Sequence, residues 1–280
     1  MACKIIVNRD SGNCARLDLE ALKCLLDCKD AEIENITHST DWAADGFDTV
    51  VVCGGDGTLH HALNKCQNQQ IIYAPCGTLN EASATENTLH SVGKVNGENF
   101  SYVCACGSFT GIGYAAKTER KKRWKRIAYL PQIFKQYRCH EIDAKLTVDG
   151  KTLDGSYTLL MVIKSHRCFG YFFNPMYKKC KKLYLLGIKS LGKDCLRNRI
   201  RMFFPFFRVF FCGISHPMSR KGWFLTPFDN LTMTLKDAQD FCLDGEKRTF
   251  CGELEIKEQP LDKEIFIIKP PFCRRRNAKK

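Results

Sequence analysis

The sequence lacks several features that would assign it to a well-defined class. Its 17 cysteines include no C-x-x-C pair, which excludes the usual spacing of a zinc site. It has no stretch of about 18 uncharged apolar residues, so no membrane span is expected. Met1–Val7 becomes polar too early for a signal peptide. We therefore expect a cytoplasmic protein with reduced cysteines.

Acidic residues are in the minority. The sequence has 30 Asp and Glu residues and 43 Lys and Arg residues, so its net charge is +13. A positive charge of this size attracts polyanions. The densest basic run, residues 119–126, has no nucleic-acid fold signature beside it. We therefore expect no nucleic acid partner. An anionic membrane surface is favoured, and a solvated face is an equal alternative.

The most informative stretch is residues 50–60. Four apolar residues precede Gly54-Gly55-Asp56-Gly57-Thr58, which predicts a buried strand, a tight turn and the start of a helix. Glycines permit positive φ and the close approach of an anion, and a helix N-terminus favours phosphate. Asp56 would repel phosphate unless it held a cation such as Mg²⁺. The alternative is a plain strand–turn–helix connection.

The first third of the chain alternates strands and helices. Strands are predicted at residues 4–7, 31–36, 48–53 and 71–74, and helices at 17–28 and 59–66. This alternation predicts a parallel sheet with helices on its faces, which binds ligands at the carboxyl ends of its strands. The polar turns at residues 8–13, 54–58 and 75–81 fall at those ends.

The pattern changes after about residue 93. Strands are predicted at residues 100–106, 144–148, 157–163, 183–188, 231–235, 252–257 and 264–268, and helices at 124–136 and 195–212. This half is predicted to be a mostly antiparallel sandwich with helical insertions. The basic tail at 274–280 is expected to be disordered.

Three motifs in order make the sequence recognisable. Gly54–Thr58, Pro75-x-Gly77-Thr78-x-Asn80-Glu81 and Asp244-Gly245-Glu246 resemble the diacylglycerol kinase catalytic-domain family, which includes bacterial lipid kinases and sphingosine kinases. The resemblance implies an α/β plus β fold. It would have a Rossmann-like nucleotide-binding domain at 1–93, a β-sandwich lipid-substrate domain at 94–272 and a basic tail at 273–280. The active site would lie in the cleft between the two domains.

The resemblance also implies an activity, the ATP-dependent phosphorylation of a lipid hydroxyl. Asp244, Glu246 and Asp56 would be catalytic, with Asp244 the candidate base for the lipid hydroxyl and Asp56 also a Mg²⁺ ligand. The implied nucleotide-binding residues are Asn8, Gly54, Gly55, Gly57, Thr58, Gly77, Thr78, Asn80 and Glu81. Without the glycine motifs, Asp244-Gly245 would be interpreted as a simple β-turn.

Two stretches depart from the family pattern. Glu81 stands where Asp is usual, and Lys178–Lys182 stands where the family often has an Asp-Asp-Gly that helps to hold a structural Mg²⁺. We expect this basic run to make other contacts or to face lipid head groups.

Two further stretches have competing interpretations. Residues 203–211 contain six phenylalanines beside several arginines, which indicates either a lipid-facing wall or a core helix that covers the sandwich. His60-His61 has no third ligand at metal spacing, so a surface or packed helix position is favoured.

The sequence therefore predicts a lipid kinase that is peripheral to the inner face of the membrane. Its expected partners are a lipid substrate and an anionic membrane surface, and a homodimer is retained as an option. One alternative is a soluble kinase related to NAD kinase. The other is a non-catalytic relative that binds lipid or nucleotide.

Overall fold

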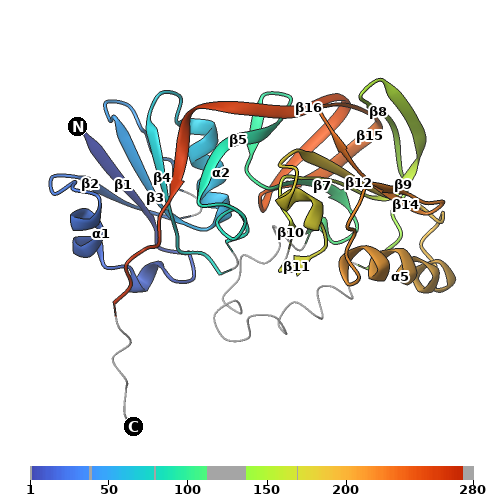
Figure 1. Ribbon diagram of the computed structural model, residues 1–280, viewed down its shortest axis with the longest axis horizontal. Helices are drawn as coiled ribbons and strands as arrows, with labels where there is room; N and C mark the ends of the chain where they lie inside the picture. Colours follow the sequence, from blue (N-terminus) through green and yellow to red (C-terminus); the bar gives the residue numbers. More distant parts are fainter. Residues whose placement is uncertain (1, 38–39, 79, 112–136, 169, 274–280) are drawn as a thin grey trace, which may run out of the picture. The chain divides into compact units, whose positions relative to one another are not determined.

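The computed structural model (Figure 1) describes residues 2–37, 40–78, 80–111, 137–168 and 170–273. The chain divides into two compact units: unit 1 is Met1–His90 with Leu261–Lys280, and unit 2 is Ser91–Pro260. The first boundary lies close to the one predicted after residue 93. The segment after residue 260 differs from the prediction, because it returns to unit 1.

Unit 1 is built on a parallel sheet. Its strands are β1 (Cys3–Asn8), β2 (Glu32–Ile36), β3 (Thr49–Gly54) and β4 (Gln70–Pro75). The order is β2-β1-β3-β4, and the end of β16 (Glu246–Ile267) adds a further parallel strand beside β4. All residues of β1 and β3 are buried, as expected for central strands covered on both faces.

Two helices accompany this sheet. Helix α1 (Leu19–Leu25) is capped at its N-terminus by Asp18, whose side chain accepts a hydrogen bond from the Ala21 N–H at 3.1 Å. Its buried Leu22 packs with Ile5 and other residues of one sheet face. Helix α2 (Asp56–Lys65) packs against β3 and β4.

Unit 2 consists mainly of antiparallel strands. They are β5 (Thr88–Val95, which begins in unit 1), β6 (Glu98–Phe100), β7 (Val103–Gly107), β8 (Ile142–Val148), β9 (Lys151–Ile163), β10 (Arg167–Cys168), β11 (Tyr171–Phe172), β12 (Leu183–Lys189), β13 (Met218–Ser219), β14 (Trp223–Phe228), β15 (Asn230–Leu243) and β16. Strand β9 pairs with β7, β7 with β15, β15 with β8, and β8 with β9. The pairing closes into a ring, as in a barrel, and this differs from the two separate sheets of the predicted sandwich.

Helix α5 (Leu196–Phe210) covers one face of unit 2. Along β9, Leu160 and Val162 belong to one core cluster, while Leu159 and Met161 belong to a second cluster with residues of α5. Successive strand residues point to opposite faces, so both faces of β9 are buried.

Most predicted elements lie within a few residues of the observed ones. The strands predicted at 252–257 and 264–268 fall in the single long strand β16, which ends at Ile267. The predicted helix at 124–136, the basic run at 119–126 and the tail at 274–280 lie outside the described residues. Among the described residues, no helix has the length and apolar character needed to cross a membrane.

Candidate functional site

Three loops follow β1, β3 and β4 at the carboxyl edge of the parallel sheet in unit 1. Asn8, the last residue of β1, donates a hydrogen bond from Nδ2 to Thr58 Oγ1 in α2 at 2.9 Å. The Gly55 N–H, at the start of α2, donates to Ser11 Oγ at 3.2 Å. The turn after β1 is therefore bound to the first turn of α2.

The same turn is bound to the loop after β4. Asn13 donates from its backbone N–H to Cys76 O at 2.8 Å and from Nδ2 to Gly77 O at 3.0 Å. Cys76 donates in turn to Gly54 O at 2.6 Å. The three loops therefore form one hydrogen-bonded group.

Gly55 and Gly77 face each other across this group. A Cβ on Gly77 would lie 2.8 Å from Gly55 Cα and 2.4 Å from Asn80 Oδ1. Gly55 has φ −93° and ψ −175°, which is extended backbone. Positive φ was therefore the wrong reason to expect glycine at Gly55; the reason is the close approach of the two backbones.

Asp56, the first residue of α2, joins the first glycine loop to the segment after the second. Its carboxylate accepts hydrogen bonds from the Glu81 N–H at 2.7 Å and the Ala82 N–H at 3.3 Å. It also accepts one from the buried Tyr73 hydroxyl at 3.4 Å, and burial, followed by the Asp56 charge, raises the pKa of Tyr73 well above its usual range. The carboxylate that sequence reasoning assigned to Mg²⁺ thus fastens two loops together.

Asn80 has a constrained position in the second loop. Its φ of 47° lies in the left-handed region, and its Nδ2 donates to Gly77 O at 3.1 Å. Its Oδ1 is buried and has no hydrogen-bond partner among the residues that the structure describes. A buried acceptor of this kind is satisfied by a donor from water or from a bound molecule.

The other predicted site residues of unit 1 lie in the same group of loops. Gly54 ends β3, Gly57 lies inside α2, and Glu81 is buried. A Cβ on Gly12 would lie 2.8 Å from Thr78 Oγ1, so these two turns also touch. The predicted nucleotide-binding residues are therefore brought together within unit 1.

Cysteines lie within or directly beside these loops. Cys14, Cys53 and Cys76 are buried, and Cys14 Sγ donates to Cys53 O at 3.4 Å. A hydrogen bond between the thiols of Cys14 and Cys76 lowers the pKa of Cys14 and raises that of Cys76, whereas burial raises the pKa of Cys53. All 17 cysteines are free thiols. These three act as small core residues beside the loops.

His60 is fully buried in α2, which agrees with the packed helix position favoured from the sequence. Within the part of the chain that the structure describes, no group of three or more His, Cys, Asp or Glu side chains is arranged to hold a metal ion.

Asp244 and Glu246 belong to unit 2, in the hairpin between β15 and β16. Asp244 has φ 51° and is only 2% exposed. Its carboxylate accepts hydrogen bonds from the backbone N–H groups of Ser101, Tyr102 (3.0 Å) and Val103 (3.1 Å). Asp244 thus forms the β-turn considered as the alternative interpretation and also secures the start of β7.

Three residues of the loop group were not in the predicted site. Ser11 and Asn13 bind the neighbouring loops, and Tyr73 contacts Asp56. Ser11 and Asn13 lie in the polar turn at 8–13, which was the available signal. Tyr73 is one apolar residue among several in a buried strand and gives no signal in the sequence.

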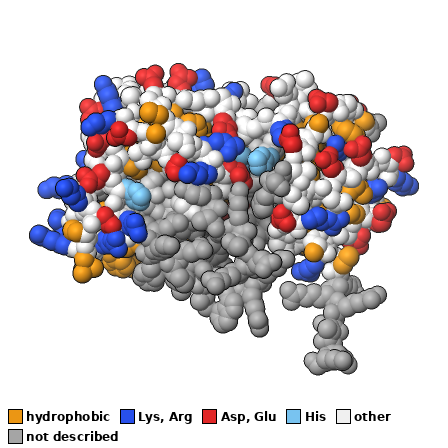
Figure 2. All heavy atoms as spheres, turned by 180° about the vertical axis from the view of Figure 1, so that it is seen from behind, with side chains coloured by type: hydrophobic (Ala, Val, Ile, Leu, Met, Phe, Trp, Pro, Cys, Tyr) orange, Lys and Arg blue, Asp and Glu red, His pale blue; other side chains and the backbone are white. Residues whose placement is uncertain are grey.

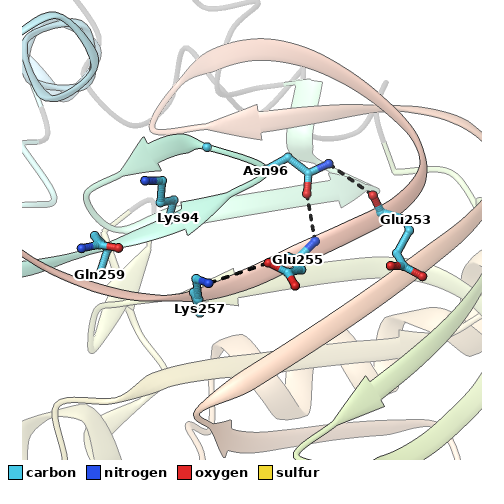
Figure 3. Close-up of a pocket in the computed structure, with 7 residues that line it drawn as sticks. Lys94, Asn96, Glu253, Glu255, Lys257 and Gln259 are labelled. Carbon is cyan, nitrogen blue, oxygen red and sulfur yellow. Dashed lines mark hydrogen bonds and ion pairs between the residues drawn. The ribbon is translucent and has the colours of Figure 1, made fainter.

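A separate polar pocket of about 470 Å³ lies in unit 2 (Figure 3). Asn96 links the two strands that line the pocket. Its Oδ1 accepts a hydrogen bond from the Glu255 N–H at 2.9 Å, and its Nδ2 donates one to Glu253 O at 3.2 Å. Lys94, Lys257 and Gln259 complete the sides shown in Figure 3. None of the predicted site residues lines it.

The fold and the loops define a class: a two-unit α/β plus β protein with a glycine-lined site at the edge of a parallel sheet. Residues 3–95 match the family model described as the diacylglycerol kinase catalytic domain. The resemblance seen in the sequence is thereby confirmed over these residues. No curated protein matches the chain.

Solved structures with a similar fold cover nearly the whole chain. A structure of diacylglycerol kinases from Bacillus anthracis str. Sterne has 17% identity and a TM-score of 0.64, covering 96% of this chain and 97% of that one. A candidate diacylglycerol kinase from the same organism has 18% identity and a TM-score of 0.66, covering 95% and 97%. At these identities the similarity shows the fold alone.

Proposed function

We propose that this protein is an ATP-dependent lipid kinase that transfers the γ-phosphate to a lipid hydroxyl. In this proposal unit 1 is a Rossmann-like nucleotide-binding domain and unit 2 provides the lipid-substrate domain. The observation that carries the proposal is the meeting of Gly55 and Gly77 in loops that match the kinase family model.

The residues present fit a nucleotide. Gly55 and Gly77 leave a cradle that any Cβ would fill, at the N-terminus of the ten-residue helix α2. Asn80 Oδ1 offers a buried acceptor to a donor such as a base amino group or a ribose hydroxyl. When bound, ATP supplies the transferable phosphoryl group. The chain's own residues hold the loops in one arrangement. Because Gly55 and Gly77 have no side chains, they leave free the space in which the phosphates would lie.

The residues present do not fit a Mg²⁺ ion held by the protein alone. Both oxygens of Asp56 already accept backbone N–H groups, and the described residues contain no metal-ligand cluster. The proposal therefore assigns no step to a protein-bound metal.

A non-catalytic relative that binds lipid or nucleotide is the second candidate. Asp244, the proposed general base, is buried and accepts three backbone N–H groups, and Asp56 is similarly engaged. In this candidate both carboxylates are structural.

The test is an assay with γ-labelled ATP on a total lipid extract, beside a parallel assay on NAD. We expect label in the lipid fraction and none on NAD. Label on NAD alone would favour the NAD kinase alternative. ATP binding without transfer to either acceptor would favour the non-catalytic relative.

A further inference from the structure

Helix α5 exposes an apolar face that the described residues of unit 2 do not cover. We define the α5 aromatic face as the exposed apolar residues of this helix and its end: Leu196, Ile200, Phe203, Phe204, Phe207 and Phe211. Met202, Phe206 and Val209, on another side of the helix, are buried in unit 2. The helix therefore has apolar residues on both its buried and its exposed sides.

The exposed rings pack on one another. Phe207 stacks on Phe203 with ring centroids 5.6 Å apart and on Phe211 with centroids 5.3 Å apart. Phe203 makes an edge contact with Phe204 at 6.0 Å. The rings thus form a continuous ridge along the helix.

The ridge continues into the β10–β11 hairpin. Tyr171 contacts Phe211 with ring centroids 5.1 Å apart, and Tyr171 and Phe172 are 40% and 61% exposed. An apolar surface assembled from two separate segments is larger than the isolated exposed residues found on most proteins.

Arginines line one edge of the ridge. Arg197 follows Leu196, and Arg201 follows Ile200. Successive residues of a helix are about 100° apart around its axis, so both arginines lie along the same edge of the α5 aromatic face. Both are exposed, and among the described residues neither forms an ion pair. Arg199, by contrast, pairs with Asp194. Helix α5 contains no acidic residue. In Figure 2, hydrophobic and basic side chains lie side by side at this end of unit 2.

We propose that the α5 aromatic face docks on the interface of an anionic phospholipid bilayer. Aromatic residues at the level of the head groups, flanked by cations that bind anionic lipid, are the chemistry of an interfacial helix. The net charge of +13 favours an anionic surface and disfavours a second copy of the chain. The inference deepens the proposed function, because a lipid kinase must reach an acceptor that lies in a membrane.

The experiment is co-sedimentation of the full chain with vesicles of phosphatidylcholine, with or without phosphatidylglycerol, and without ATP. The first variant is Phe204→Ser with Phe211→Ser. Its matched control is Leu25→Ser with Phe266→Ser, which removes exposed apolar residues (60% and 46%) from unit 1. We expect the first variant to lose at least about tenfold in vesicle affinity, and the control to lose none.

The second variant, Arg197→Gln with Arg201→Gln, tests the charged edge. Its control is Arg220→Gln with Lys221→Gln, which removes the same charge from an exposed turn. We expect about a thirtyfold loss of affinity for anionic vesicles only, and weaker binding as salt rises.

Several outcomes would overturn the proposal. They are absence of wild-type binding to anionic vesicles, equal binding to neutral and anionic vesicles, and wild-type binding by the Phe204/Phe211 variant. A dimer in sedimentation velocity that this variant abolishes would assign the face to a second copy instead. Circular dichroism verifies that each variant is folded. Because vesicle binding needs no turnover, failure here is distinguishable from failure of the proposed function, which is measured as transfer of label from ATP to a lipid extract.

Discussion

Gly55 and Gly77 approach each other backbone to backbone because neither has a side chain. A Cβ on Gly77 would lie 2.8 Å from Gly55 Cα, which is too close for two carbon atoms, so one loop must move if Gly77 is replaced. Since the other atom is backbone, rotation of a side chain does not relieve the contact.

Gly77→Ala should therefore weaken ATP binding by at least tenfold and lower the free energy of unfolding by about 1–3 kcal/mol. Gly222→Ala is the matched control, because nothing lies within 4 Å of its added Cβ and its φ is not positive. Isothermal titration calorimetry and urea unfolding measure the two quantities. Equal ATP affinity in both variants would show that the cradle does not contact the nucleotide.

Asp56→Asn separates the two roles assigned to this carboxylate. Asp56 links two loops by accepting two backbone N–H groups. The side-chain amide of Asn has one acceptor oxygen and can replace only one of these hydrogen bonds. We therefore expect the free energy of unfolding to fall by about 1–3 kcal/mol. We expect ATP affinity to fall equally in Mg²⁺ and in EDTA. Loss of affinity confined to the Mg²⁺ samples would instead identify Asp56 as a metal ligand.

Asp244→Asn should both destabilise unit 2 and slow turnover. The asparagine amide group would face backbone N–H donors in a buried position, which costs about 2–3 kcal/mol. Loss of a general base lowers the rate by about 10²–10⁴. Urea unfolding gives the fraction folded, and turnover is compared per folded molecule. Near wild-type turnover on that basis would place the base elsewhere.

At the scale of the element, α5 uses phenylalanines for two purposes. Phe206 is 6% exposed and contacts Phe109 and Phe210, with ring centroids 5.0 and 6.0 Å away. Phe204, two residues earlier, is 68% exposed. The same residue type in one helix therefore serves the core at one position and the surface at the other.

Phe206→Ala should lower the free energy of unfolding by about 3–5 kcal/mol, because it leaves a cavity in a packed core. Phe204→Ala should change it by less than about 0.5 kcal/mol. Both are measured by urea unfolding with circular dichroism. A large effect of Phe204→Ala would mean that this ring supports the fold and would remove it from the exposed face.

Local patterns predicted most of the helices and strands correctly. The apolar run before Gly54 and the helical spacing after Gly57 each depend on neighbours in sequence, and both elements formed where expected. The closure of β7, β9, β8 and β15 into a ring was not predictable, because each pairing joins residues that are distant in the sequence. The phenylalanine segment was left open between core and surface, and α5 contains both.

The candidate site was predictable to the extent that it is carried by motifs. The glycine loops and Asn80 were identified because their order is distinctive. The hydrogen bonds that Asp56 accepts from the backbone of Glu81 and Ala82 were not predicted. The sequence does not indicate which residue a side chain contacts when the two are 25 or more positions apart. Asp244 was assigned as a base without the knowledge that its carboxylate is buried and accepts the backbone N–H groups of Ser101, Tyr102 and Val103.

At the scale of the whole molecule, the chain crosses between its units twice, through β5 and β16. After leaving unit 2, β16 places Phe266 and Ile267 beside Ile72 and Tyr73 of β4. Further along, Asp18 N–H donates to Pro271 O at 3.0 Å. Unit 1 is therefore completed by residues that follow the whole of unit 2 in the sequence.

Deletion of residues 261–280 should abolish ATP binding and leave unit 2 folded. The deletion removes the strand beside β4, whose far end leads into the second glycine loop. Limited proteolysis should then cleave unit 1 rapidly while a fragment covering Ser91–Pro260 persists. Wild-type ATP affinity in the truncated chain would show that the returning segment is dispensable for the site.

The return of β16 to unit 1 also sets the order in which the protein can fold during synthesis. A ribosome makes unit 2 in full before residues 261–273 are available to pair with β4. Until then β4 is an open edge strand with unpaired backbone groups, the kind of surface through which nascent chains associate wrongly. We therefore expect the newly made N-terminal segment to depend on chaperones for as long as the ribosome takes to translate unit 2.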